Sequence, residues 1–276
     1  MSIRGEKNLI SVIQLGTIDY STGLRLQEQL IALRKEEKIG DVLLLLEHSP
    51  VITLGRNAKA ANVVASRELL AQRGVELFEC DRGGDVTFHG PGQIVGYPIF
   101  DLRGYARVGP GLRPGQVERS STARKHLGAV DFVRCLEDVL MRTCADFAIA
   151  TKRVPGLTGV WSENEAKLAA IGVHISRFVT SHGFALNVNT DLSYFNLIIP
   201  CGITSKTVTS MQKDLGRPLD LNAVAESISR NFGVVFQSQI LWVDTLDALL
   251  GRAVGVPMKP PQEFRRFHDE DDNAWA

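Results

Sequence analysis

The sequence predicts a globular protein that contains both helices and strands. Residues 20–37 and 130–149 carry apolar side chains at helical spacing. Three consecutive segments between residues 158 and 189 are instead typical of strands, with a turn at 162–165. The composition agrees, because 44% hydrophobic and 22% charged residues are ordinary values for a soluble globular chain.

Charge and composition weigh against several classes of protein. The formal net charge of the 276 residues is zero, whereas nucleic-acid-binding domains normally carry a basic excess. The chain has no apolar run of the roughly 18 residues that a membrane span needs. Its first residues resemble neither a signal peptide nor an Arg-rich transit segment. We therefore expect a cytoplasmic protein with no nucleic-acid partner and no membrane anchor.

The first third of the chain is expected to fold as strands around two helices. Alternating or continuous apolar patterns predict strands at residues 8–15, 42–47, 51–54 and 75–79. The strand at 51–54 follows a His-Ser-Pro turn, which suggests a hairpin. Between the last two strands, we expect a short helix that Ser66 caps, with Gly74 just past its end.

Residues 79–101 form a glycine-rich segment. They contain five glycines and two prolines, and glycine at this density lets the backbone approach a ligand closely or take left-handed dihedral angles. Arg82, Asp85, Thr87, His89 and Gln93 are among its polar side chains. The segment therefore predicts a binding loop between strands, for a small molecule or an acyl group.

Residues 105–129 differ in composition from the rest. They are rich in glycine and proline and carry five basic residues against one acid, Glu118. Such a segment buries little, so it is either a surface excursion or a basic dock for an acidic partner. Cys135 and Cys144 fall in the following helix and are expected to be small buried hydrophobic residues. A further helix is expected at 220–232, and residues 257–276 form a polar, acidic tail.

Cys201 is the first candidate for chemistry. It stands between Pro200 and Gly202, a bent and uncrowded setting that a nucleophile needs if a carbonyl carbon is to reach it. A free thiol has a pKa of about 8.5 and needs a nearby cation or base to become a useful thiolate. Local sequence leaves both a nucleophile and an inert turn cysteine open.

Lys167 is the second candidate, because it is the only charge within an apolar run of small residues. On a strand it would share a face with Ala169 and Ile171. A lysine removed from water loses proton affinity and can serve as a base. The alternative, an edge-strand lysine whose ammonium reaches water, fits equally well.

Other chemistries have less support. The four cysteines lie far apart, which disfavours a disulfide framework and structural zinc. His89, His174 and His182 match no metal-binding spacing, and His89 is expected to hold the backbone or a ligand by hydrogen bonds. Ser181 is not within a Gly-x-Ser-x-Gly motif. The glycine-rich segment lacks the Gly-Lys-Ser/Thr ending of a phosphate-binding loop.

Four motifs together resemble the lipoyl (octanoyl) transferases. They are Arg82-Gly-Gly-Asp-Val-Thr-Phe-His-Gly-Pro-Gly-Gln93, Lys167-Leu-Ala-Ala-Ile-Gly172, Ser181-His-Gly-Phe-Ala-Leu-Asn-Val-Asn189 and Pro200-Cys-Gly-Ile203. The likeness runs from about residue 43 to residue 221, with the motifs in the family's order. A glycine-rich loop alone would be weak evidence, but four ordered motifs are highly specific.

The resemblance implies a fold and a reaction. The fold is α+β, with a mixed or antiparallel sheet flanked by helices, as in the catalytic domains of biotin and lipoate protein ligases. The reaction transfers an octanoyl or lipoyl group from acyl carrier protein to a lysine of lipoyl domains, which belong to the 2-oxoacid dehydrogenases, or of the glycine cleavage H protein. No metal or cofactor is implied, and a monomer is expected. One acyltransferase domain would span residues 1–256, followed by the tail.

The resemblance also assigns residue roles. In the family a cysteine takes the acyl group and a lysine serves as acid and base, roles that fall here on Cys201 and Lys167. The family's substrate-binding segments fall on Arg82, Gly83, Gly84, Asp85, Val86, Thr87, Phe88, His89, Ala170, Ile171, Gly172, Gly183, Phe184 and Ala185. Among these, the four apolar side chains proposed as walls for an eight-carbon chain are Val86, Phe88, Ile171 and Phe184.

The sequence departs from the family in two places, and two other functions compete with acyl transfer. The excursion at about residues 107–128 is longer than the family usually carries, and the tail has no counterpart. An ATP-dependent lipoate or biotin protein ligase shares the fold and the lysine position, but it has no use for a nucleophilic cysteine. A non-enzymatic acyl-binding protein would keep only the pocket.

Overall fold

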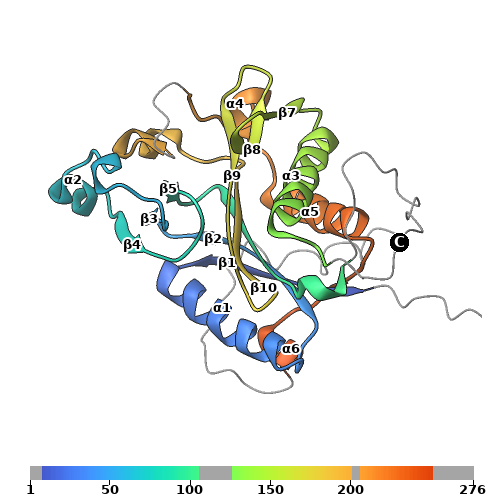
Figure 1. Cartoon of the computed structure of the whole chain (residues 1–276). Helices are drawn as coiled ribbons and strands as arrows, with labels where there is room; N and C mark the ends of the chain where they lie inside the picture. Colours follow the sequence, from blue (N-terminus) through green and yellow to red (C-terminus); the bar gives the residue numbers. More distant parts are fainter. Residues whose placement is uncertain (1–7, 106–125, 201–205, 251–276) are drawn as a thin grey trace, which may run out of the picture.

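Two sheets organise the part of the chain that the computed structural model describes, residues 8–105, 126–200 and 206–250 (Figure 1). The larger sheet has eight strands in the order β11-β1-β2-β6-β10-β9-β8-β7. These are β1 (Leu9–Ile18), β2 (Asp41–His48), β6 (Gln93–Ile99), β7 (Thr151–Val154), β8 (Leu157–Ser162), β9 (Lys167–Ser176), β10 (Val179–Asn187) and β11 (Gln239–Trp242). β1 runs parallel to β2 and β11, and the other pairs are antiparallel.

Helices cover both faces of this sheet. α3 (Ala129–Asp146) and α5 (Leu221–Val235) lie side by side over one face, and α1 (Tyr20–Lys35) lies on the other (Figure 1). The short helices are α2 (Arg67–Gln72), α4 (Met211–Leu215) and α6 (Leu246–Leu250), with 3-10 turns η1 (Ala60–Asn62), η2 (Leu102–Gly104) and η3 (Leu192–Leu197). Asp19 caps α1 by accepting a hydrogen bond from the Thr22 backbone N–H, which satisfies one of the free donors of the first turn.

The central strand β2 shows why this layered arrangement forms. All its residues are buried, and successive side chains of a strand point to opposite faces. Leu43 and Leu45 pack into the cluster that contains α3 and α5, whereas Leu44 and Leu46 pack with α1. A continuous run of leucine therefore needs an apolar layer on each side, and the two helical layers supply it.

The smaller sheet stands apart, with strand order β4-β3-β5. It consists of β3 (Val51–Leu54), β4 (Glu76–Glu79) and β5 (Val86–His89). The hairpin predicted at residues 51–54 is wrong, because β3 does not pair with the preceding strand β2. β2 already has β1 on one edge and β6 on the other, so β3 pairs with β4 and β5 instead.

Most predicted elements are confirmed, and the α+β class is correct. The helices expected at 20–37, 130–149 and 220–232, and the three strands between 158 and 189, are present with small shifts in their ends. The structure adds the short strands β7 and β11, and it places β5 within the predicted binding loop and β6 after it.

The basic excursion and the tail lie mostly outside the described residues. At the two ends of the excursion, Tyr105 and Leu127 are buried in the core shared by α3 and α5. Residues 106–125 and 251–276 are not described. The division into one domain over residues 1–256 and a tail therefore stays a prediction.

Candidate active site

A cavity of about 340 Å³ lies between the smaller sheet and the β9–β10 hairpin. That volume falls within the range of small-molecule pockets, about 300–1,000 Å³. Many residues from the predicted substrate-binding segments line it: residues 82–85, Thr87, His89, residues 170–172 and residues 183–185. Lys167 lines it as well.

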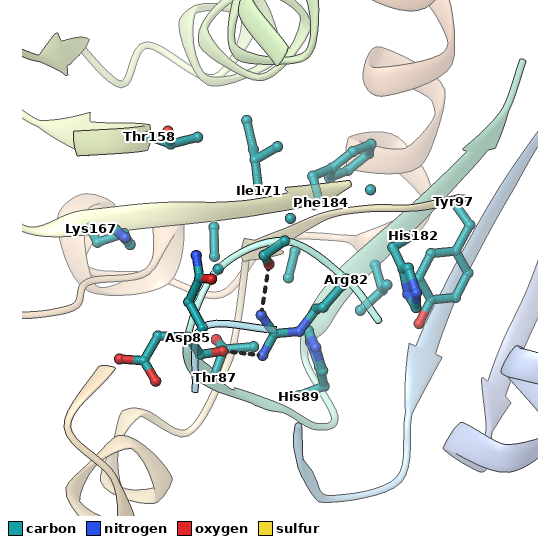
Figure 2. A pocket seen from close by; sticks show the side chains of 18 of the residues that line it. Arg82, Asp85, Thr87, His89, Tyr97, Thr158, Lys167, Ile171, His182 and Phe184 are labelled. Atoms are coloured by element: carbon teal, nitrogen blue, oxygen red, sulfur yellow. Dashed lines mark hydrogen bonds between the residues drawn. The ribbon is translucent and has the colours of Figure 1, made fainter. Parts of the chain in front are cut away.

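The cavity has a distinct character at each end. Figure 2 shows Lys167 at one end and Tyr97 with His182 at the other, while Ile171 and Phe184 lie between them. An amine at one end and apolar side chains along the middle suit a ligand with a reactive head and a hydrocarbon body.

Arg82 fastens the glycine-rich segment to the smaller sheet. Its guanidinium donates to the Thr53 carbonyl at 2.7 Å, to the Thr53 hydroxyl at 2.9 Å and to the Asp85 carbonyl at 2.6 Å. Figure 2 shows the bond to Asp85. The side chain is buried, and a buried cation needs hydrogen bonds to replace its water. Arg82 thus shapes the cavity wall through neutral oxygen atoms.

Two glycines let this segment lie against β9. Gly84 has a φ of +91°, a conformation that other residues rarely adopt. A Cβ on Gly172 would lie 2.5 Å from the Gly83 carbonyl oxygen. The Gly83 N–H donates to the Val173 carbonyl at 3.2 Å. The backbone of the loop and that of the strand therefore meet with no room for a side chain.

Strand β5 divides its residues between the cavity and a core. Thr87 and His89 line the cavity, whereas Val86 and Phe88 belong to the core cluster of the smaller sheet. The alternation follows from the two-residue period of a strand. The side chains of Val86 and Phe88 are therefore not cavity walls, which corrects that part of the expectation from sequence.

His89 belongs to a buried network that reaches toward Lys167. Its Nδ1 lies 2.8 Å from Gln93 Oε1, and Gln93 Nε2 donates to Asn187 Oδ1 at 2.9 Å. Asn187 Nδ2 donates to the carbonyl of Thr209. The N–H of Thr209 in turn donates to the carbonyl of Lys167. Because Gln93 offers its oxygen, the proton of His89 lies on Nδ1. Burial lowers the pKa of His89 to about 3, so this imidazole is neutral at physiological pH.

The end of the cavity opposite Lys167 contains residues that were not predicted from sequence. Tyr20 and Tyr97 line it, and His48 Nε2 lies 2.6 Å from the Tyr97 hydroxyl. His48 is fully buried, and burial lowers its pKa to about 4. Tyr97 lies within the segment 79–101, but its place in an apolar run gave no signal of this role.

His182 and His174 share one carboxylate beside the cavity. His182 Nε2 lies 2.7 Å from Asp81 Oδ1, and His174 Nδ1 contacts Asp81 Oδ2. Burial alone would raise the pKa of Asp81. Hydrogen bonds from His182 and His174 outweigh this effect, and the net result is a pKa below the usual value. Burial lowers the pKa of His182 despite this carboxylate. Asp81 thereby joins the glycine-rich segment to β9 and β10.

Lys167 is an interior residue of the sheet. It begins β9, which has β8 on one side and β10 on the other, and its side chain is 9% exposed. The alternative of an edge-strand lysine reaching bulk water is therefore wrong. Its backbone N–H donates to the Thr207 carbonyl at 2.8 Å.

Cys201 lies outside the described residues, which end at Pro200 and resume at Lys206. The other three cysteines are free. Burial raises the pKa of Cys135 and of Cys144 to about 12, so neither thiol forms a thiolate readily. Cys80 donates its thiol to the Leu54 carbonyl.

The described residues lack two structural features. They contain no group of three or more His, Cys, Asp or Glu side chains arranged to hold a metal ion. Within the same residues, no helix combines the length and the apolar character that crossing a membrane requires.

Comparison with known sequences gives a consistent result. The family model described as "Lipoyl protein ligase A/B catalytic domain" matches residues 19–233. The octanoyltransferase of Koribacter versatilis is 57% identical over 265 residues, which are 95% of this chain and 98% of that protein. The octanoyltransferase of Acidobacterium capsulatum is 52% identical over 249 residues, 88% of this chain and 96% of that protein.

Solved structures share the fold at low sequence identity. A lipoate-protein ligase A bound with ATP has a TM-score of 0.64 at 12% identity, covering 89% of this chain and 92% of that one. A bipartite lipoate protein ligase from Thermoplasma acidophilum, studied with its E2 lipoyl domain, has a TM-score of 0.60 at 13% identity. That match covers 87% of this chain and 86% of the other.

Proposed function

The chain belongs to the lipoyl protein ligase A/B catalytic-domain family, and from this premise we propose how it transfers an octanoyl group. Its relatives at 57% and 52% identity are octanoyltransferases over nearly their whole length. The chain is accordingly an acyltransferase of protein lipoylation. The acyl donor is octanoyl-acyl carrier protein, and the acceptor is a lysine of a lipoyl domain.

The observation that carries the mechanism is the buried Lys167 at one end of an apolar cavity. The cavity holds the octanoyl chain along Ile171 and Phe184, with its thioester carbonyl toward Lys167. An amine at this place can accept a proton from a nucleophile and return it to a leaving group. Substrate-binding roles for residues 82–85, Thr87 and His89 of the glycine-rich segment are supported by their place on the cavity wall.

Contacts on both sides of residues 201–205 support Cys201 as the nucleophile. The Ile199 N–H donates to the Asn62 carbonyl at 2.7 Å, and Asn62 Nδ2 donates to Asp85, a cavity residue, at 2.6 Å. On the other side, Thr207 accepts a hydrogen bond from the Lys167 backbone. The chain is therefore fastened near the cavity both before and after the cysteine.

The reaction proceeds in two half-reactions. Lys167 removes the Cys201 thiol proton, the thiolate attacks the octanoyl thioester carbonyl, and the carbon–sulfur bond to the carrier breaks. The ammonium of Lys167 returns the proton to the departing thiolate, which leaves as the free thiol of the carrier. The acceptor lysine then attacks the Cys201 thioester, Lys167 takes its proton, and this proton passes to the Cys201 thiolate. Thioester exchange is nearly isoenergetic and amide formation is downhill, so ATP is not needed.

The partners and the setting belong to the same proposal. Acceptors are lipoyl domains of 2-oxoacid dehydrogenases and the glycine cleavage H protein. The fold shared with a ligase studied alongside its E2 lipoyl domain supports this class of acceptor. The protein acts as a cytoplasmic monomer.

An ATP-dependent ligase is the second candidate, because a solved neighbour of the same fold binds ATP. The two functions separate in a transfer assay that follows the mass of a lipoyl domain. With octanoyl-acyl carrier protein and no ATP, wild-type enzyme should modify the domain, and Cys201→Ala should lose at least 1,000-fold in rate. Cys135→Ala is the matched control, since that thiol lies on α3 away from the cavity, and it should retain activity.

Two outcomes would contradict the proposal. The first is a wild-type enzyme that modifies the lipoyl domain only from octanoate and ATP, which would identify a ligase. The second is undiminished transfer by Cys201→Ala. Lys167→Arg tests the other half of the pair: arginine keeps the positive charge but cannot give up its proton, so transfer should collapse.

A further inference from the structure

The indole ring of Trp161 lies against the side chain of Lys167, outside the residues that line the cavity. We propose that Trp161 is a positioning residue, whose ring face holds the amine of Lys167 and electrostatically favours its ammonium form. The inference rests on the proposed role of Lys167 in acyl transfer. It gives a function to the Gly159-Val-Trp161 segment, which neither the motifs nor the mechanism above have used.

The geometry is that of a cation–π contact. Lys167 Nζ lies 4.7 Å from the centroid of the Trp161 ring, within the roughly 6 Å at which such contacts act. Trp161 is fully buried and Lys167 is 9% exposed. Removal from water strengthens the attraction between an ammonium and a ring face. The contact is therefore of the stronger kind.

The strand pairing fixes this contact. Trp161 on β8 is the cross-strand partner of Lys167 on β9, and the register shifts between Val160 and Trp161. Directly opposite residues in antiparallel strands place their side chains close together on one face. The shift lets Trp161 meet the first residue of β9, while Val160 still pairs with Ala169.

Gly159 lets β8 lie close against the backbone of β9 beside Lys167. It has a φ of +122°, and a Cβ there would lie 2.5 Å from the Ala169 carbonyl oxygen and 3.7 Å from Lys167 Cε. The Gly159 N–H donates to Glu137 Oε1 at 3.1 Å. Glu137 is a fully buried residue of α3 that also accepts from Arg153 at 2.7 Å. The helix therefore fixes the strand segment that carries Trp161.

The hydrogen-bonding state of Trp161 favours a role for its ring face. A buried indole N–H usually has a hydrogen-bond partner, but Trp161 Nε1 has none among the described residues. Tryptophan is also the aromatic residue that attracts cations most strongly. The N–H of Trp161 therefore makes no hydrogen bond within the described residues. The ring face, in contrast, contacts Lys167 directly.

The ring would act on proton transfer and leave acyl binding alone. Lys167 alternates between amine and ammonium in each half-reaction, and the ammonium is present while Cys201 is a thiolate. The quadrupole of the ring lowers the energy of that charged pair. Because Trp161 does not line the cavity, its electronic character should affect kcat for acyl transfer and leave KM for the acyl donor unchanged.

Fluorinated tryptophans test this without a change in shape. Trp242→Phe and Trp275→Phe leave Trp161 as the single tryptophan of the chain, and fluorine atoms added to the indole weaken its quadrupole in steps. We expect the rate of octanoyl-enzyme formation from octanoyl-acyl carrier protein to fall with each step. A tetrafluorinated ring should lower it roughly tenfold, with KM and the melting temperature nearly constant. A rate that stays constant across the series would overturn the proposal.

Variants in the same assay separate this inference from the proposed function. Trp161→Phe keeps a weaker ring face and should retain more of the rate than Trp161→Leu, compared at equal folded fractions. Equal rates for these two variants would count against a role of the ring. Cys201→Ala should abolish acyl-enzyme formation, and Lys167→Arg should make it far slower. If they do not, the proposed function itself fails, independently of the fluorination result.

Discussion

Gly172→Ala should displace the glycine-rich segment from β9 and slow acyl transfer. The added Cβ would lie 2.5 Å from the Gly83 carbonyl oxygen, which must move by about 0.9 Å to reach the 3.4 Å at which ordinary contact begins. The hydrogen bond from Gly83 N to the Val173 carbonyl, now 3.2 Å long, would stretch or break. Because Arg82 and Gly83 line the cavity, its wall would move with them.

The size of this displacement sets the expected effect. A misplacement of about 1 Å near reacting groups can lower a rate roughly 100-fold. Overpacking of a tight contact costs about 1–3 kcal/mol in the free energy of unfolding. We therefore expect kcat/KM for octanoyl transfer to a lipoyl domain to fall about 30- to 100-fold. The melting temperature should fall by about 3–10 °C.

Gly40→Ala is the matched control for this prediction. Gly40 precedes β2, and a Cβ there would meet only the Leu9 carbonyl oxygen, 4.0 Å away. This variant should keep the activity and melting temperature of the wild type. The reasoning is refuted if Gly172→Ala also matches the wild type. A full rate at a lower temperature, where the variant is completely folded, would also refute it. Such a result would mean that the loss came from unfolding and not from a displaced cavity wall.

Three further predictions concern the buried polar groups. Tyr97→Phe removes the hydroxyl bonded to buried His48 and should lower the free energy of unfolding in urea by about 1–3 kcal/mol; an unchanged midpoint would contradict this. Glu137→Leu leaves the Gly159 N–H unpaired and should cost about 1–3 kcal/mol in the same assay and slow transfer; wild-type values for both would count against the link from α3 to β8. Burial holds the pKa of His48 at about 4 and that of His89 at about 3, below the value of 6.5 for an unperturbed imidazole. At a pH between the folded and unfolded values, the unfolded chain therefore binds more protons than the folded chain. Above pH 7 these groups should not affect the free energy of unfolding. As the pH falls below 6.5, the free energy of unfolding should decrease by about 1.4 kcal/mol per pH unit for each histidine. A urea midpoint that stays constant from pH 7 to pH 5 would contradict this pH dependence.

Sequence patterns predicted local elements far better than their pairing. The leucine run of β2 and the apolar stripe of α3 are buried as their periodicities indicate. The hairpin after β2 failed because a turn signal reports only where the chain bends. Which strand pairs with β3 depends on the edges that β1 and β6 already occupy, and those contacts are distant in sequence.

The candidate site was partly predictable for a similar reason. The motifs around Lys167 and residues 82–85 identified segments that meet at the cavity. They could not say which side chains of β5 face it, so Val86 and Phe88 were assigned to the wrong side. Sequence patterns give no sign of Tyr20 and Tyr97, because each reaches the cavity only through the packing of its own element. Cys201 lies outside the described residues, and its role rests on the motif and the contacts beside it.

The intact mass of the protein after mixing with octanoyl-acyl carrier protein is the decisive test of the covalent mechanism. If Cys201 is the nucleophile, the wild-type chain should gain one octanoyl group, carried by Cys201 and discharged when a lipoyl domain is added. The adduct should be absent in Cys201→Ala and should form far more slowly in Lys167→Arg. Full transfer by the wild type with no adduct at any time, or an adduct that persists in Cys201→Ala, would contradict the covalent mechanism.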